Sequence, residues 1–464
     1  MRRIAGSYRK LVLEARIWPW WLSPAWLSLA FITPIYVLTL GYLGISAQTS
    51  AIRQSGFIPS LDVGLAVLGA ACLIAFGLGG LGYRAAANLH RNSARIAIRR
   101  RSSGPVSEIR QAPVGSVAAY LALLCLTIIG YGFFFYGALR GGGISLALRA
   151  LSGDVASTYT IRDTGHLLPG LSTLTQVGPA LIVSLIVAPP KHPKWLRIFT
   201  LSAFAVVGLA ALRTVIWSER LAIIEILLPA AIAWSVKEGF DRRHARIAQI
   251  MPLVMLGGLV LIFGLLETIR SWGHYDAIYS GNWLRFVLDR LALYYGLAIS
   301  NGINFILDVP GYLGHLNFSF DWLYKLPFLK EWSWAVSYQE MGEIYWESLK
   351  AHGTQEFNNQ SGVFAYIYDY GPLSLLAFAV AGYLAERAYR IALSGRVFSR
   401  LIYPFVFLAI LELLREPFFT SSRMFYTFGA LLISQMTLTY YRQADASTVP
   451  WLAEPERPAP IMAE

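Results

Sequence analysis

The chain has 464 residues, a formal net charge of +12 and a composition that is 56% hydrophobic but only 14% charged. Soluble domains carry about 25% charged residues, so this composition excludes a soluble enzyme, a disordered chain and a fibrous repeat. It indicates instead an all-α polytopic membrane protein. The two cysteines, Cys72 and Cys125, lie inside apolar runs, and we expect both to be buried as small hydrophobic residues.

Apolar runs of about 17–25 residues are candidate membrane spans because that length of helix crosses a bilayer. The sequence contains ten of them. In chain order they cover residues 22–45, 61–83, 114–138, 167–188, 195–213, 221–236, 248–267, 361–385, 401–419 and 425–441. We therefore expect about ten transmembrane helices.

The distribution of basic residues predicts the orientation of these spans. With the N-terminus placed in the cytoplasm, the cytoplasmic segments hold 25 of the 39 Lys and Arg residues, including the dense run from Arg84 to Arg110. Cytoplasmic loops carry an excess of Lys and Arg, so we expect both termini to lie inside. The positive charge is thus interpreted as a topology signal at an anionic leaflet, and no nucleic-acid partner is expected.

One segment between predicted spans, residues 268–360, is much longer than the others and falls on the external side. It holds nine of the 27 acidic residues, three of the seven histidines and twenty aromatic residues. Loops of this length are uncommon unless they are functional. Within it, residues 283–308 are apolar but carry six polar side chains, so we expect an amphipathic helix lying at the outer surface. The expected organisation is seven spans in 1–267, the external segment, three spans in 361–441 and a cytoplasmic tail in 442–464.

Five arginines fall at external span ends or just beyond them, although positive charge is normally kept inside. They are Arg213, Arg220, Arg270, Arg415 and Arg423. One interpretation is that they form salt bridges at helix ends with Glu219, Glu267 and Glu416. As a set, they also suit an anionic headgroup, because guanidinium binds phosphate oxygens bidentately and keeps its charge.

A polar run, residues 352–362, leads directly into the predicted span 361–385. Amides, a carboxylate and an imidazole at a span entrance suit sugar hydroxyls and proton transfer. The candidate general bases are Glu356 and His352, and the candidate sugar-binding residues are Asn358 and Gln360. The competing interpretation of this run is a helix N-cap with solvated neighbours.

A further carboxylate, Asp369, lies about two turns inside the same span. It is a third candidate for catalysis, but it also fits a buried residue that hydrogen-bonds to a neighbouring helix. The sequence has no Walker loop, dinucleotide fingerprint or HExxH motif. We therefore expect neither a cofactor nor a metal site.

The order of these features resembles the bacterial oligosaccharide repeat-unit polymerases of the Wzy type, the O-antigen polymerase family. Two stretches carry the resemblance: Ser218–Leu221 at the head of the sixth span and Asn358–Gly371 at the entrance to the eighth. The Asp369-Tyr370-Gly371 turn is similar to the acid-x-Gly motif of that family. The O-antigen ligases are more distantly similar, but Asn358 and Gln360 stand where those enzymes carry histidines, so the ligase base is missing.

The resemblance implies a glycosyltransferase C-like fold and a membrane glycosyltransferase. Such an enzyme polymerises undecaprenyl-diphosphate-linked oligosaccharide repeat units into O-antigen, capsule or exopolysaccharide at the periplasmic face of the bacterial inner membrane. The five arginines would stabilise the diphosphate leaving group without a metal. The acceptor hydroxyl needs a base, for which the order of preference is Glu356, His352 and Asp369.

The implied partners are the lipid-linked oligosaccharide, the lipid bilayer and a polysaccharide chain-length regulator. Two alternatives stay open. One is a ligase-type glycan transferase, and the other is a non-enzymatic flippase or exporter of lipid-linked oligosaccharide. A transporter should carry its charged residues along a central path in both halves of the chain, whereas here they gather at the predicted outer side.

Overall fold

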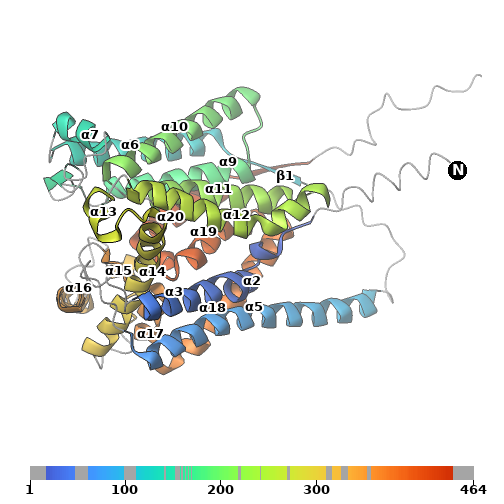
Figure 1. The fold of residues 1–464 in the computed structure, drawn as a ribbon. Helices are drawn as coiled ribbons and strands as arrows, with labels where there is room; N and C mark the ends of the chain where they lie inside the picture. Colours follow the sequence, from blue (N-terminus) through green and yellow to red (C-terminus); the bar gives the residue numbers. More distant parts are fainter. Residues whose placement is uncertain are drawn as a thin grey trace, which may run out of the picture.

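The computed structural model is a bundle of helices that share a roughly common direction (Figure 1). It describes most of the chain between residues 17 and 442. The described ranges are 17–46, 61–98, 111–140, 143–151, 170–217, 221–240, 242–268, 272–309, 316–324, 333–352 and 357–442, with a few residues between 157 and 168.

Six helical stretches in the described part of the chain are long and apolar enough to cross a membrane. The first is Pro24–Ile45, in α2 (Pro24–Leu27), η2 (Ser28–Ile32) and α3 (Thr33–Ser46). The next four are Val63–Leu89 in α5 (Val63–Ile98), α6 (Val117–Arg140), α10 (Pro193–Trp217) and Arg246–Leu265 in α12 (Arg242–Glu267). The last is Gly362–Leu393, in α17 (Gly362–Tyr370), η6 (Gly371–Leu373) and α18 (Ser374–Leu393). The fold is therefore that of a helical, multi-pass membrane protein.

The other four predicted spans are helices that are shorter or more highly charged. They are Ser172–Val187 in η3 (Ser172–Gln176) and α9 (Val177–Val187), α11 (Leu221–Glu238), α19 (Val397–Glu412) and α20 (Ser422–Met436). Whether all ten helical stretches cross the bilayer remains a prediction.

The last expected span ends earlier than predicted, and the span that begins near residue 361 contains a break. The last apolar run does not stay helical to residue 441, because α20 ends at Met436 and β2 (Thr439–Arg442) pairs antiparallel with β1 (Gln111–Val114). The run 361–385 is not one continuous helix, because Gly371 adopts a φ of 50° that glycine tolerates and separates α17 from η6 and α18.

The two cysteines differ in burial, contrary to expectation. Cys72 is buried in the main hydrophobic cluster, whereas Cys125 is exposed on the surface of α6. Exposed apolar residues such as Ile128 and Ile129 lie on the same helix. The sequence pattern of a span does not reveal which of its faces meets lipid, so the burial of one cysteine on that helix was unpredictable.

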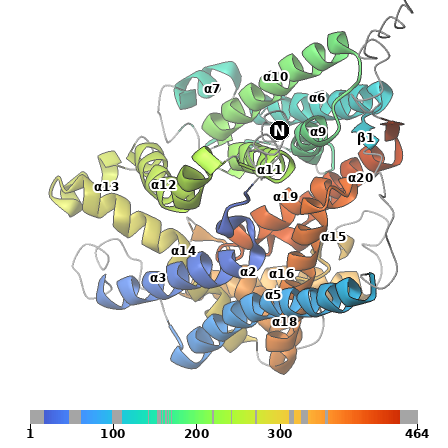
Figure 2. The ribbon, with the colours of Figure 1, turned by 90° about the vertical axis from the view of Figure 1, so that its right-hand side faces the viewer.

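The two ends of the bundle differ (Figures 1 and 2). One end carries β1 and β2 and is called the β end. At the other end lie α7 (Gly143–Leu151), α13 (Gly273–Tyr279), α14 (Trp283–Asp308) and α16 (Ser333–His352), and it is called the α14 end. The distribution of Lys and Arg predicts that the β end is cytoplasmic.

Helix α14 runs across the ends of its neighbours rather than alongside them (Figures 1 and 2). Its expected position at the outer surface stays a prediction. The expected exposure of its polar face does not hold, because Asp289, Arg290, Asn301 and Asn304 are all buried. Helices α3, α12, α13, α16 and α17 pack around α14 and enclose these residues.

The closest helix contact joins α5 and α18 through small residues. A Cβ atom added at Gly382 would overlap the carbonyl oxygen of Phe76, and one at Gly79 would overlap the carbonyl oxygen of Ala379. Such close backbone approach is typical of small-residue contacts between membrane helices.

Replacement of Gly382 by alanine is expected to force α5 and α18 apart. The cost of overpacking is about 1–3 kcal/mol, measured as a lower midpoint of thermal unfolding in detergent. Gly82→Ala is the matched control, because a Cβ at Gly82 has no neighbour within 4 Å. Equal midpoints for the two variants would show that the helices do not pack this closely.

Candidate functional site

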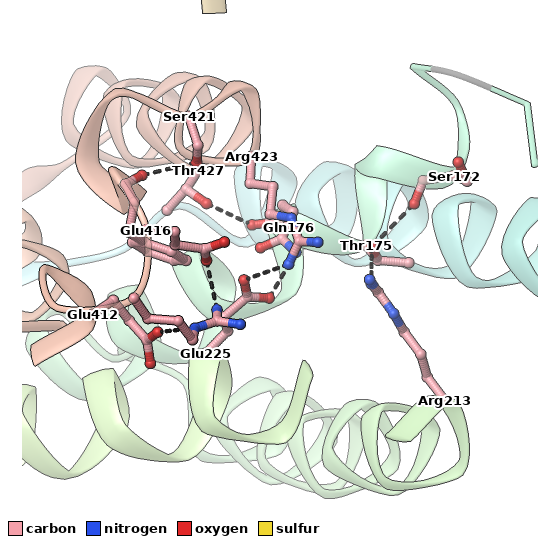
Figure 3. Close-up of polar contacts among 12 residues, drawn as sticks. Ser172, Thr175, Gln176, Arg213, Glu225, Glu412, Glu416, Ser421, Arg423 and Thr427 are labelled. Atoms are coloured by element: carbon pink, nitrogen blue, oxygen red, sulfur yellow. Dashed lines mark hydrogen bonds and ion pairs between the residues drawn. The ribbon is translucent and has the colours of Figure 1, made fainter. Parts of the chain in front are cut away.

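Three of the five predicted arginines come together at the α14 end of the bundle. Arg213 lies near the end of α10, Arg415 in the turn after α19, and Arg423 in the first turn of α20. Figure 3 labels Arg213 and Arg423. These three helix ends meet because α10, α11, α19 and α20 pack around α9. Arg220 and Arg270 lie outside the described residues.

A buried carboxylate, Glu225 of α11, lies in the middle of this group (Figure 3). It accepts a hydrogen bond of 2.7 Å from Gln176 Nε2, and its Oε1 lies 3.3 Å from Arg423 Nη1. Thr427 of α20 donates to the Gln176 carbonyl at 3.0 Å, which ties α20 to the same point. Glu225 is not among the predicted site residues, although a carboxylate in an apolar run is a functional signal.

Arg415 is surrounded by acceptors. Its guanidinium donates to Glu412 and to Glu416, each at 2.6 Å, and to the Tyr294 hydroxyl of α14 at 3.0 Å. The salt-bridge interpretation is therefore the observed geometry for Arg415, with Glu416 as an expected partner and Glu412 as an additional one.

Arg213 contacts a hydroxyl group and an aromatic ring. Its Nη1 donates to the Thr175 hydroxyl at 2.8 Å, and its Cζ lies 4.7 Å from the centre of the Phe134 ring. Since Thr175 precedes Gln176 in η3 (Ser172–Gln176), Arg213 lies beside the group around Glu225 (Figure 3).

The polar run before α17 packs directly on the turn that carries Arg415. The backbone N–H of Val363 and the hydroxyl of Ser361 donate to the Leu413 carbonyl at 3.2 and 3.4 Å. A Cβ atom at Gly362 would lie 2.7 Å from the Glu416 carbonyl oxygen. Ser361 occupies the expected N-cap position, but its side chain bonds to this turn instead of capping the helix.

Helices α14 and α16 hold the same run from the other side. Asn301 Nδ2 donates to the carbonyls of Phe357 and Asn359 at 2.7 and 3.1 Å. The Tyr345 hydroxyl donates to the Asn358 carbonyl at 2.9 Å. Burial raises the pKa of Tyr345, so the hydroxyl keeps the proton that it donates.

Of the two predicted sugar-binding amides, Asn358 is fixed through its carbonyl by Tyr345. Gln360 is buried, and its Nε2 has no hydrogen-bond partner within the part of the chain that the structure describes. A buried amide without a partner is costly, so this donor is suited to a water or a ligand.

The candidate bases lie in different places. Glu356 is outside the described residues, but the ring of Phe357, which follows it, lies 6.3 Å from that of Tyr294, a partner of Arg415. His352 meets α14 at Asp308, 3.3 Å away, which is fourteen residues beyond Tyr294. At 1.5 Å per residue, His352 and Arg415 meet α14 at points about 21 Å apart along its axis.

Asp369 is buried and hydrogen-bonded. It accepts from the N–H and the hydroxyl of Ser319 at 2.6 and 2.7 Å, and from the N–H of Phe318 at 3.3 Å. This is the geometry of the buried alternative, except that the partner is a turn within residues 317–320 rather than a helix.

A buried ion pair between α12 and α14 also contacts the polar run. Arg290 Nη2 lies 2.6 Å from Glu267 at the end of α12, so the observed partner of Glu267 is on α14. The Arg290 guanidinium also lies between the rings of Tyr275 and Phe357, at 4.9 and 4.7 Å from their centres. Because Phe357 belongs to the polar run, Arg290 connects α12 and α14 to it.

In the described residues, no group of three or more His, Cys, Asp or Glu side chains is arranged to hold a metal ion. No protein-family model, curated protein or solved structure matches the chain. The interpretation of the site therefore rests on its own geometry.

Proposed function

We propose that the chain is a membrane glycosyltransferase that polymerises undecaprenyl-diphosphate-linked oligosaccharide repeat units. In this proposal the α14 end faces the periplasm of a bacterial inner membrane. The observation that supports it is the contact between the polar run and the turn of Arg415, which brings amides suited to sugar hydroxyls beside a cluster of arginines.

The reaction forms a bond between the acceptor hydroxyl oxygen and the anomeric carbon of the growing glycan. The bond from that carbon to the diphosphate oxygen breaks, and the acceptor proton passes to a general base. The diphosphate leaves as a weakly basic anion, so it needs charge stabilisation more than a proton.

The three described arginines are suited to different tasks. Arg415 already has two carboxylate partners, so we assign it the role of holding the turn in place. Arg423 has a side chain that is 36% exposed and pairs with Glu225, so it can exchange this partner for a phosphate oxygen. Glu225 then keeps its hydrogen bond from Gln176.

Glu356 is the preferred base because its chain neighbour Phe357 lies next to Tyr294 and Arg290. Glu356→Gln is expected to lower polymer formation by at least about 10²-fold, the lower end of general-base contributions. The measurement is the product ladder formed from purified lipid-linked repeat units, with bound substrate measured in parallel. Bound substrate should remain unchanged.

His352→Ala is the matched control, since His352 meets α14 far from Arg415. It should leave the ladder almost unchanged. An inactive His352→Ala variant alongside an active Glu356→Gln variant would transfer the role of base to His352.

The proposal is tested by incubating the purified wild-type chain with lipid-linked repeat units alone. A polymerase extends them into a ladder of products that differ by one repeat. Unchanged single repeats would contradict polymerisation. Transfer to an added lipid acceptor without a ladder would identify a ligase, and movement between leaflets without any new bond would identify a flippase.

A further inference from the structure

A second group of charged side chains lies near the opposite, β end of the bundle and takes no part in the proposed reaction. Arg84 of α5 and Arg390 of α18 both place their Nε atoms on the same oxygen, Glu386 Oε1, at 2.7 and 3.0 Å. The hydroxyl of Ser23 donates to Glu386 Oε2 at 2.7 Å and also accepts from Arg84 Nη2.

This group carries two positive charges and one negative charge, so one positive charge is not balanced within it. Two guanidinium groups share one carboxylate, and Glu386 is completely buried while the side chains of Arg84 and Arg390 are 22% and 43% exposed. Both arginines use Nε for Glu386, so most of their terminal donors are left over. Within the described part of the chain, the Nη groups of Arg390 have no hydrogen-bond partner.

The group lies at the depth where lipid headgroups are expected. Arg84 is near the end of the apolar stretch Val63–Leu89, and Arg390 is in the last turn of the stretch Gly362–Leu393. Tyr83 and Tyr383 stack edge-to-face beside it, with ring centres 5.1 Å apart. Tyrosine is enriched at membrane–water interfaces, which is consistent with this depth.

We propose that Arg390 and Arg84 bind the phosphate of an anionic phospholipid headgroup in the leaflet at the β end. Arginine suits this role because its planar fork binds phosphate oxygens bidentately. Basic pockets between membrane helices on the cytoplasmic side bind anionic headgroups in this way. In this proposal Glu386 holds both guanidinium groups through their Nε atoms, and their remaining N–H donors bind the lipid phosphate.

The test uses the full-length protein in detergent, titrated with phosphatidylglycerol and observed by native mass spectrometry. Arg390→Gln is expected to weaken binding of the first phosphatidylglycerol about tenfold, the worth of one charge-assisted contact. Glu386 keeps Arg84 as its partner in this variant, so no buried carboxylate is left without a counter-charge. Arg390→Lys, which keeps the charge but not the fork, should give an intermediate loss.

Arg387→Gln is the matched control, because it removes the same charge from an exposed position on the same helix. Equal losses for Arg387→Gln and Arg390→Gln would overturn the proposal, since they would indicate a non-specific charge effect. Equal affinity for phosphatidylcholine would also overturn it. If inorganic phosphate displaced the lipid completely at similar concentration, the site would be one for free phosphate rather than for a lipid.

Discussion

Arg423→Gln is expected to lower polymer formation by about 10²–10³-fold, the effect of removing one group that stabilises a developing anion. The reason is that the Arg423 side chain is partly exposed and pairs with the carboxylate of Glu225, so it can exchange this carboxylate for a phosphate oxygen. The measurement is the rate of ladder formation by the purified variant, compared with the wild-type chain at equal protein concentration.

A double variant separates this role from a structural one. If Arg423 only neutralises Glu225, then Arg423→Gln with Glu225→Gln should restore activity, because neither charge remains. If Arg423 binds the diphosphate, the double variant should stay inactive although it folds. Restored activity in the double variant would therefore contradict the assignment.

Arg290→Met is expected to destabilise the protein by about 3–5 kcal/mol, because it leaves the carboxylate of Glu267 buried without its counter-charge. Both members of this pair are almost completely buried. The measurement is the free energy of unfolding in detergent. The double variant Arg290→Met with Glu267→Leu should recover most of the loss, since both charges are then removed.

Arg285 offers the matched control for this prediction. It lies on the same helix, but its side chain is 46% exposed and lies 3.9 Å from Asp289, beyond hydrogen-bonding distance. The buried carboxylate of Asp289 keeps the hydrogen bond from the Tyr42 hydroxyl when Arg285 is removed, so Arg285→Met should cost less than Arg290→Met. Equal losses of unfolding free energy from Arg285→Met and Arg290→Met would show that the buried pair of Arg290 and Glu267 contributes no extra stability. The Arg290→Met variant should also make a shorter ladder, because Phe357 loses the guanidinium that holds it.

The helices were largely predictable from the sequence, because apolar runs of bilayer length have few alternative structures. The ends of these runs were less predictable. Thr439–Arg442 forms a strand because it pairs with Gln111–Val114, more than 300 residues earlier. The local composition of a segment cannot predict a partner so far away in the sequence. The burial of α14 has a related origin, since α3, more than 200 residues earlier in the chain, packs against it together with α12, α13, α16 and α17.

The residue types of the site could be predicted from the sequence, but the ion pairs and hydrogen bonds between them could not. The sequence indicated Arg213, Arg415 and Arg423 together, and the structure places them at the ends of α10, α19 and α20 that lie at the α14 end of the bundle. Glu225 and Arg290 were not predicted as site residues because their place in the site depends on partners from other helices, which the sequence does not reveal.

The central claim is that the diphosphate of the lipid-linked substrate lies at the α14 end, although both ends of the bundle carry arginines. Photo-crosslinking with a polyprenyl diphosphate that carries a photoreactive group next to the phosphates tests this claim directly. Peptide mapping is expected to find the label on residues 412–427 or on η3 around Gln176. Labelling confined to the peptides that contain Arg84 and Arg390 would contradict the account.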